Sequence, residues 1–186
     1  MFLSHDIIEQ YIDEGKIIIK PDFDKKNIRP AGIRVHLAKD ILVPESDQKI
    51  EMGESVDLKY REIDLEKEDY WLESNGFILG ATVEAIQTTK DVLMFLDGRS
   101  TIARMGLTTH VTASVIDGTF EVPHVAVLEI KNLGNFTIKL KAGVPIAMML
   151  FAELKGEVSQ KIQGQYGGHQ GKATPPNLKF QTGSDL

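Results

Sequence analysis

Short runs in which apolar residues alternate with polar ones recur along most of the chain. They are rich in β-branched residues and are separated by Gly, Pro, Asn and Asp. These runs are residues 16–20, 32–44, 69–86, 91–98, 125–132, 136–143 and 145–154. Many short strands with turn residues between them are typical of an antiparallel sandwich or barrel, and not of alternating strands and helices. We therefore expect a mainly β protein.

Two segments follow helical spacing instead. Near the N-terminus, Ser4 precedes an amphipathic stretch that Gly15 ends, which predicts a short capped helix. A second, interior helix is predicted within residues 99–107. Its expected inward-facing residues are Ile102, Met105 and Leu107.

The pattern divides the chain into a β domain with its N-terminal helix, residues 1–154, and a C-terminal segment, residues 155–186. The C-terminal segment loses the strand pattern and gains Gly, Gln and Pro, which favours a segment that folds over a bound ligand. Residues 46–68 are highly charged, and we expect them to form a surface excursion.

Composition narrows the classes of function. The chain has 186 residues, no cysteine and a net charge of −6. Disulfides, thiolate zinc sites and cysteine nucleophiles are thereby excluded, and the acidic balance argues against a nucleic-acid partner. No apolar run is long enough to cross a membrane, and the N-terminus does not have the pattern of a signal peptide. We expect a cytoplasmic protein without a membrane partner.

Residues 97–117 hold the most unusual group of polar side chains. Gly98 allows a tight turn at a strand end, and the hydroxyls and amides at the start of the following helical turn can favour an anion. Arginines that flank such a turn can bind phosphate oxygens in a forked geometry. The same residues also fit an ordinary capped helix with two solvated arginines. The side chains concerned are Arg99, Ser100, Thr101 and Arg104.

The strand predicted over residues 125–132 carries a carboxylate within an apolar run. Alternation places Glu129 on one face with Val125, Val127 and Lys131, and Leu128 on the other face. Glu129 is then either on a solvated face or buried. Burial would raise its pKa and suit a group that takes up and releases a proton.

Other titratable residues give weaker signals. Asp117 fits a turn former at a strand end. His110 fits a base or ligand, although a lone histidine in a β run is more often a satisfied core residue. His124 and His169 have no second ligand at metal spacing, so we assign no metal to protein side chains. Serine-elbow, Walker and Rossmann glycine patterns are absent from the sequence.

Taken in order, the motifs resemble the dCTP deaminase branch of the trimeric dUTPase superfamily. They extend over nearly the whole chain. The matching segments are DIIEQYIDEGKIIIKP, IRPAGIRVHL, GATVEAI, DGRSTIARMGL, THVTASVID, VLEIKN, KAGVPIAMMLF and QYGGHQG. The resemblance implies a distorted jelly-roll or β-barrel of the dUTPase-like type, assembled as a homotrimer with active sites between neighbouring subunits.

The resemblance also implies roles for individual residues. It assigns the triphosphate to Arg99, Ser100, Thr101 and Arg104, and the deoxyribose to Asp117. It assigns the cytosine edge to Val127 and Leu128, acid–base catalysis to Glu129, and contacts from the closing tail to Tyr166 and Gln170. Magnesium would be carried by the triphosphate of a dCTP- or dUTP-type nucleotide, and not by a protein ligand cage.

The implied reaction is the hydrolysis of dCTP to dUTP and ammonia, in the supply of dUMP and dTTP. Most nucleobase deaminases use zinc held by His and Cys, whereas this chain has no cysteine and no H-x-E pattern. We therefore expect a deamination mechanism that uses no zinc or other protein-bound metal. Glu129 takes a proton from the attacking water and passes protons to N3 and the leaving ammonia. Ser100 positions the water, and Arg104 steadies the polar cluster.

Several positions depart from the family pattern. Arg34 and His36 stand where an acidic and then a basic residue are usual, and Val115 stands where deaminases tend to have Arg or an aromatic residue. Residues 118–128 form a longer segment than usual. In the tail, Gln165 and His169 replace frequent Lys and Gln. These departures leave open whether the product is dUTP or dUMP.

Alternatives follow from the same motifs. A bifunctional deaminase and diphosphatase would give dUMP. A dUTPase would use Asp117 to activate water at the α-phosphate and would not need Glu129. A non-catalytic nucleotide-binding regulator on this fold is a further alternative, and a structural jelly roll is a remote one.

Overall fold

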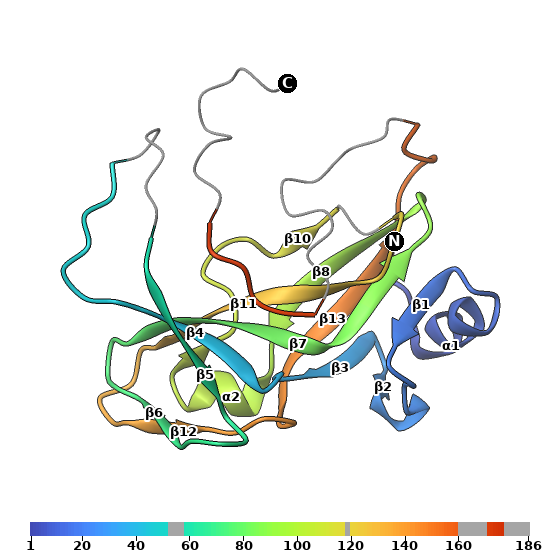
Figure 1. Cartoon of the computed structure of the whole chain (residues 1–186). Helices are drawn as coiled ribbons and strands as arrows, with labels where there is room; N and C mark the ends of the chain where they lie inside the picture. Colours follow the sequence, from blue (N-terminus) through green and yellow to red (C-terminus); the bar gives the residue numbers. More distant parts are fainter. Residues whose placement is uncertain (52–57, 118–119, 160–170, 177–186) are drawn as a thin grey trace.

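The computed structural model describes residues 1–51, 58–117, 120–159 and 171–176. Two α-helices and one 3-10 turn accompany strands that dominate this part of the chain (Figure 1). In chain order the elements are α1 (His5–Asp13), β1 (Ile17–Lys20), η1 (Lys25–Asn27), β2 (Ile28–Arg29), β3 (Gly32–His36), β4 (Asp40–Pro44), β5 (Tyr60–Asp64), β6 (Tyr70–Leu72), β7 (Phe77–Thr88), β8 (Val92–Gly98), α2 (Ser100–Arg104), β9 (Leu107–Thr108), β10 (Val115–Ile116), β11 (His124–Asn132), β12 (Ile138–Leu140) and β13 (Pro145–Glu153).

The strands form two main antiparallel sheets. One has the order β5-β4-β7-β11-β9, with β1 also paired to β7, and the other has the order β10-β8-β13-β3-β2. A small additional sheet pairs β12 with β6. The expected mainly β architecture with one N-terminal and one interior helix is confirmed.

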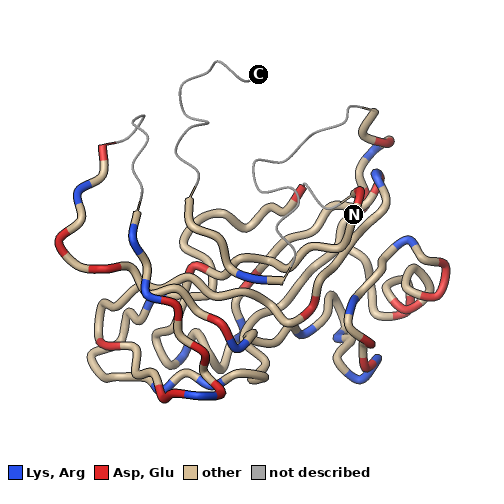
Figure 2. The backbone as a smooth tube through the Cα atoms, viewed as in Figure 1, with Lys and Arg blue, Asp and Glu red and all other residues tan. Residues whose placement is uncertain are grey.

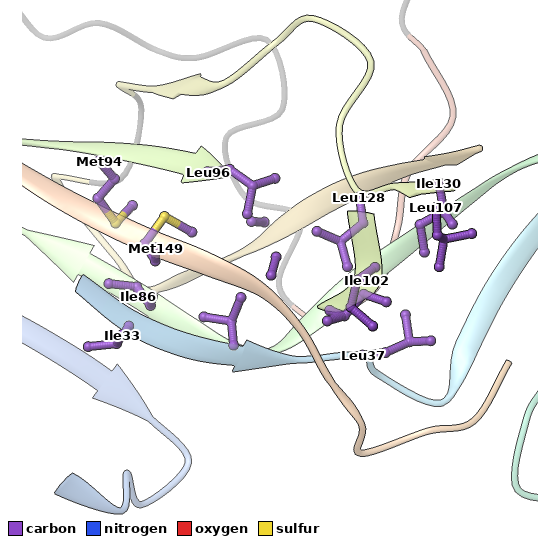
Figure 3. Close-up of a cluster of buried hydrophobic side chains, with 14 of the residues drawn as sticks. Ile33, Leu37, Ile86, Met94, Leu96, Ile102, Leu107, Leu128, Ile130 and Met149 are labelled. Atoms are coloured by element: carbon purple, nitrogen blue, oxygen red, sulfur yellow. The ribbon is translucent and has the colours of Figure 1, made fainter. Parts of the chain in front are cut away.

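The core lies between the two main sheets, because each strand turns its alternate apolar residues inward. Figure 3 shows side chains from both sheets meeting there, among them Ile33, Ile86, Leu96, Leu128 and Met149. Full burial of such a side chain contributes roughly 1.5–3 kcal/mol. Because one face of each strand is packed into the core, only side chains on the opposite face can contact a ligand.

The N-terminal helix α1 forms where the sequence predicts it. Ser4 occupies the N-cap position, although its side chain makes no capping hydrogen bond. Gly15 follows the helix with a φ of 72°, a conformation that glycine adopts without strain. Ile8 and Tyr11 are buried, and the Tyr11 hydroxyl donates a hydrogen bond of 2.6 Å to Glu153 of β13. The helix is thereby attached to a central strand.

Two sequence-based expectations need correction, the first of them only in part. Within the supposed surface excursion, residues 60–64 form β5, which pairs along all of β4. Ile63 is buried in the core, because one apolar residue among charged ones suffices for an edge strand with one solvated face. Met105 does not face inward but is 39% exposed, because α2 ends at Arg104 and the chain turns there.

The described end of the C-terminal segment, residues 171–176, lies back on the outer side of the six-stranded sheet (Figure 1). Ala173 is buried in a small cluster with Leu79 and Ala81 of β7. Next to it, Lys172 pairs with Glu62 at 2.5 Å. This sheet face is therefore partly covered by the chain's own tail.

Among the described residues no helix combines the length and the apolar character needed to cross a membrane. Acidic and basic residues are interspersed along the backbone in Figure 2.

Candidate active site

Strand β11 places Glu129 on the outer face of the six-stranded sheet. Ala126, Leu128 and Ile130 are buried, whereas Val127 and Glu129 are half-buried on the opposite face. The two faces predicted from alternation are confirmed. The Glu129 side chain is thus neither fully solvated nor sealed in the core.

Two hydrogen bonds from the loop after β9 hold this glutamate. Its carboxylate oxygen Oε2 accepts a bond of 2.9 Å from the backbone N–H of Val111, and its own N–H donates to the carbonyl of Thr109 at 3.2 Å. No hydrogen bond within the described part of the chain reaches its other oxygen, Oε1. One oxygen therefore orients the carboxylate, and the other is left to accept a proton.

The loop itself carries unsatisfied polar atoms. Thr109 is 1% exposed, and its hydroxyl has no hydrogen-bond partner among the described residues. The same holds for Nδ1 of His110, whose Nε2 lies 3.9 Å from the carboxylate of Asp97. Buried polar atoms without partners are uncommon and point to a water or ligand at this place. The sequence left His110 either as a base or ligand or as a satisfied core histidine, and it singled out neither Thr109 nor Val111.

Residues 99–104, which we call the arginine turn, directly follow β8. Arg99 is the N-cap residue of α2, with extended backbone, and its Nη1 donates to the carbonyl of Pro145 in β13. Burial, and after it the charges of Arg34 and Arg29, lowers the pKa of Arg99. Arg99 is therefore anchored in the fold. It is not a freely solvated arginine.

The other predicted phosphate contacts are exposed. Ser100, Thr101 and Arg104 all present their side chains to the surface of α2, while Ile102 is buried beneath them. The helix is thus attached by one apolar residue and leaves its polar residues available to a ligand or a neighbouring molecule.

The arginine turn and the glutamate approach each other through Thr109. A Cβ added to Gly98 would lie 3.9 Å from the Thr109 hydroxyl, and Thr109 is bonded to Glu129. Within the described residues of this single chain, however, no hydrogen bond or ion pair joins Glu129 to Ser100 or Arg104. The chain by itself brings the two halves of the predicted site near each other without connecting them.

The remaining predicted site residues are distributed differently. Asp117 is exposed, directly after β10 on the edge of the five-stranded sheet. Val127 lies on the face of Glu129, in the cluster that Ala173 covers. Tyr166 and Gln170, like Gln165 and His169, lie outside the described residues.

Leu128, which the resemblance assigns to the cytosine edge together with Val127, is 0% exposed, and its side chain belongs to the main core (Figure 3). Successive side chains of a strand point to opposite faces, so Leu128 cannot share the face of Val127 and Glu129. Any contact between Leu128 and a nucleotide must use its main chain.

Arg34 and His36, the two residues that depart from the family pattern in β3, differ in their contacts. The His36 ring Nδ1 lies 2.5 Å from one oxygen of Glu84, and the His36 backbone N–H donates to the other oxygen at 2.8 Å. Glu84 is 7% exposed, so this carboxylate is buried and fully engaged. Arg34 has no ion-pair partner among the described residues.

A cavity of about 790 Å³ lies farther along the same sheet. Val125 and Val83 line it from β11 and β7, Lys20 and Lys39 contribute cations, and Gly171 closes part of it from the tail. Its volume is within the range of small-molecule sites. The sequence contains no signal for this cavity, because it arises from the packing of segments that are far apart along the chain.

No group of three or more His, Cys, Asp or Glu side chains gathers around a possible metal position in the described part of the chain. The residues around Glu129 supply hydrogen-bond donors and acceptors, and so fit proton transfer to and from a bound molecule.

Known proteins extend this picture. Residues 2–154 match the family described as dCTP deaminase-like. The dCTP deaminase of Natronomonas pharaonis is 28% identical over 193 residues, covering 97% of this chain and 95% of that protein. The dUMP-forming dCTP deaminase of Streptomyces avermitilis is 32% identical over 182 residues, covering 92% of each chain.

Among solved structures, the 2′-deoxycytidine 5′-triphosphate deaminase from Agrobacterium tumefaciens superposes with a TM-score of 0.61 at 19% identity. The match covers 81% of this chain and 46% of that one, so this chain spans less than half of that structure's length. The fold expected from the resemblance is thereby confirmed. By its sequence over residues 2–154, the chain belongs to the dCTP deaminase-like family.

Proposed function

We propose that this protein hydrolyses the exocyclic amine of dCTP, giving dUTP and ammonia, as part of deoxyuridine nucleotide supply. The observation that carries the proposal is the placement of Glu129, a half-buried carboxylate with one oxygen held by the amide of Val111 and the other left open. Membership of the dCTP deaminase-like family supports the choice of substrate.

The chemistry needs one group that moves protons. Glu129 takes a proton from water as the water oxygen attacks C4 of the base. The proton then passes to N3, and a second transfer releases the amine as ammonia, so that dCTP and water become dUTP and ammonia. General acid–base catalysis of this kind contributes about 10²- to 10⁴-fold to a rate. The backbone of Thr109 and Val111 keeps the carboxylate in one orientation throughout.

The phosphates require cations and donors. In the proposal Arg99, Ser100, Thr101 and Arg104 bind the triphosphate, Asp117 binds the deoxyribose, and magnesium arrives with the nucleotide as part of the substrate. Ser100 and Arg104 are exposed, and among the described residues of one chain no hydrogen bond joins either of them to Glu129. We therefore place the complete site between neighbouring copies of a homotrimer, where α2 of one copy faces the glutamate of the next.

A second product has a specific observation in its favour. The relative from Streptomyces avermitilis, at 32% identity, is a dUMP-forming dCTP deaminase. The same site would then also cleave dUTP to dUMP and pyrophosphate, with Asp117 near the α-phosphate.

Chromatography of nucleotides after incubation with dCTP or dUTP, together with an ammonia assay, tests the proposal. Parallel reactions contain magnesium or a chelator. We expect ammonia and dUTP, or ammonia and dUMP, in equal amounts from dCTP. Formation of dUMP from dUTP with no reaction of dCTP would assign a dUTPase. A nucleotide-dependent rise in melting temperature without any product would assign a non-catalytic binder.

A further inference from the structure

Three arginines lie on the outer face of the five-stranded sheet, on neighbouring elements. Arg29 of β2 is opposite Gly32 of β3, and Arg34 is two residues farther along the same face of β3. Arg34 is opposite Met148 of β13. Arg99 follows β8 on the other side of β13 and donates to the carbonyl of Pro145. The three residues thus form a diagonal row across β2, β3, β13 and the end of β8.

Two acidic groups lie near this row, and each has a polar partner other than the arginines. Asp97 of β8 is opposite Met148 on the same face, and its Oδ1 accepts a hydrogen bond of 2.7 Å from the N–H of Gly98 and lies 3.9 Å from Nε2 of His110. Glu84 is buried and holds His36 with both oxygens. None of the three arginines has an ion-pair partner among the described residues, although charges of both signs are interspersed over the rest of the fold (Figure 2).

This arrangement is unfavourable for an empty protein. Three positive charges close together repel one another, and the charges of Arg34 and Arg29 act on Arg99 in addition to its burial. A bound anion with several negative charges removes the repulsion. Guanidinium groups match phosphate oxygens in a forked, bidentate geometry, which makes phosphate the best-fitting chemistry.

We propose that Arg29 and Arg34 extend the phosphate contact of Arg99 into one polyphosphate site, which takes the outer phosphates of the nucleotide. The inference rests on the proposed function for the identity of the nucleotide, but not for the anion itself.

The test is calorimetric titration of inorganic tripolyphosphate into the full-length protein, with a chelator present and no magnesium. We compare the wild type with Arg34→Gln, Arg29→Gln and Arg34→Lys. The control is Arg61→Gln, because Arg61 is exposed on β5 of the other sheet. We expect each Gln variant to bind about tenfold more weakly, Arg34→Lys to be intermediate because it keeps charge without the fork, and Arg61→Gln to be unchanged.

Unchanged affinity of both Gln variants at positions 29 and 34 would overturn the proposal, as would an equal loss for Arg61→Gln. Arg29 is exposed, so its variant stays informative if the half-buried Arg34 proves necessary for folding. The KM for dCTP separates this inference from the proposed function. Arginine-dependent tripolyphosphate binding without any deamination would remove the function and keep the site. Deamination with unchanged KM in both variants would keep the function and remove the site.

Discussion

At the scale of single residues, three neighbours on β11 have separate tasks. Val127 and Glu129 face outward, and Leu128 between them is part of the core. The reason is the two-residue repeat of a strand, which sends adjacent side chains to opposite sides. Substitutions at these three positions should therefore affect different properties.

Glu129→Gln should abolish most deamination and leave dCTP binding nearly intact. The amide has almost the same shape as the carboxylate but cannot accept a proton, so we expect ammonia release to fall by at least about 100-fold. Calorimetry should find dCTP affinity within a few-fold of the wild type. Glu73→Gln, at an exposed residue before β7, is the matched control. Full turnover by the Glu129 variant would remove this residue from catalysis.

Leu128→Ala should cost about 2–5 kcal/mol of unfolding free energy, because it removes a fully buried side chain and leaves a cavity. Val127→Ala should cost less, since Val127 is only half-buried. Urea unfolding of both variants measures the difference. Equal losses, or a larger loss for Val127, would contradict the division of faces.

At the scale of elements, turns and attachments decide how the strands are held. Two glycines of almost identical φ illustrate this. Gly106 has a φ of 72° and Gly143 a φ of 74°, yet a Cβ would lie 2.8 Å from the nitrogen of Gly134 at the first position and meet nothing within 4 Å at the second. The first glycine joins two loops closely, and the second only turns the chain.

Gly143→Ala should therefore lower the unfolding free energy only by the cost of holding an alanine in the left-handed conformation, about 1–2 kcal/mol. Gly106→Ala should cost more, because the added carbon also pushes apart the loop after α2 and the loop after β11. Thermal unfolding of the two variants under one condition gives the comparison. A smaller loss for Gly106 than for Gly143 would show that the loops separate without cost.

The attachment of α1 to β13 should make stability depend on alkaline pH. The hydrogen bond to Glu153, and after it burial, raises the pKa of Tyr11 above its ordinary 10.0. The folded protein then keeps the phenol proton where the unfolded chain has lost it, so this contribution is complete below about pH 10 and is lost as pH rises toward the folded pKa.

Tyr11→Phe removes the hydroxyl that donates to Glu153. We expect it to lower the unfolding free energy near neutral pH by about 1 kcal/mol and to flatten the decline above pH 10. Chemical denaturation at a series of pH values measures both effects. An unchanged alkaline slope in the variant would assign that slope to other groups.

At the scale of the whole molecule, the proposed trimer predicts that two inactive variants can complement each other, which a site within a single chain would not allow. If Glu129 and α2 come from neighbouring copies, Glu129→Gln and Arg104→Ala are each inactive, but a mixture refolded together regains activity. Random assembly restores about one site in four. Product formation by the mixture, with native mass spectrometry of the assembly, provides the measurement. An inactive mixture of well-formed trimers would place both residues in sites within one chain.

Several features could be predicted from local pattern. Alternation in residues 125–132 predicted the two faces of β11, and the spacing after Ser4 predicted α1. The pattern was misleading where few residues define an element. It did not predict β5, whose single buried residue is Ile63. It also predicted that Met105 faces inward, whereas α2 ends at Arg104 and Met105 is exposed.

The sequence alone determined the mainly β class, the faces of the long strands and the family, because periodicity and ordered motifs are properties of neighbouring residues. Only the tertiary structure decided that Val111 holds the Glu129 carboxylate and that Arg29, Arg34 and Arg99 form one row with no ion-pair partner within the described part of the chain. These relations depend on which strands pair and in which register, and register is set by packing of the whole core. The residues next to each of these positions in the sequence therefore do not indicate these contacts.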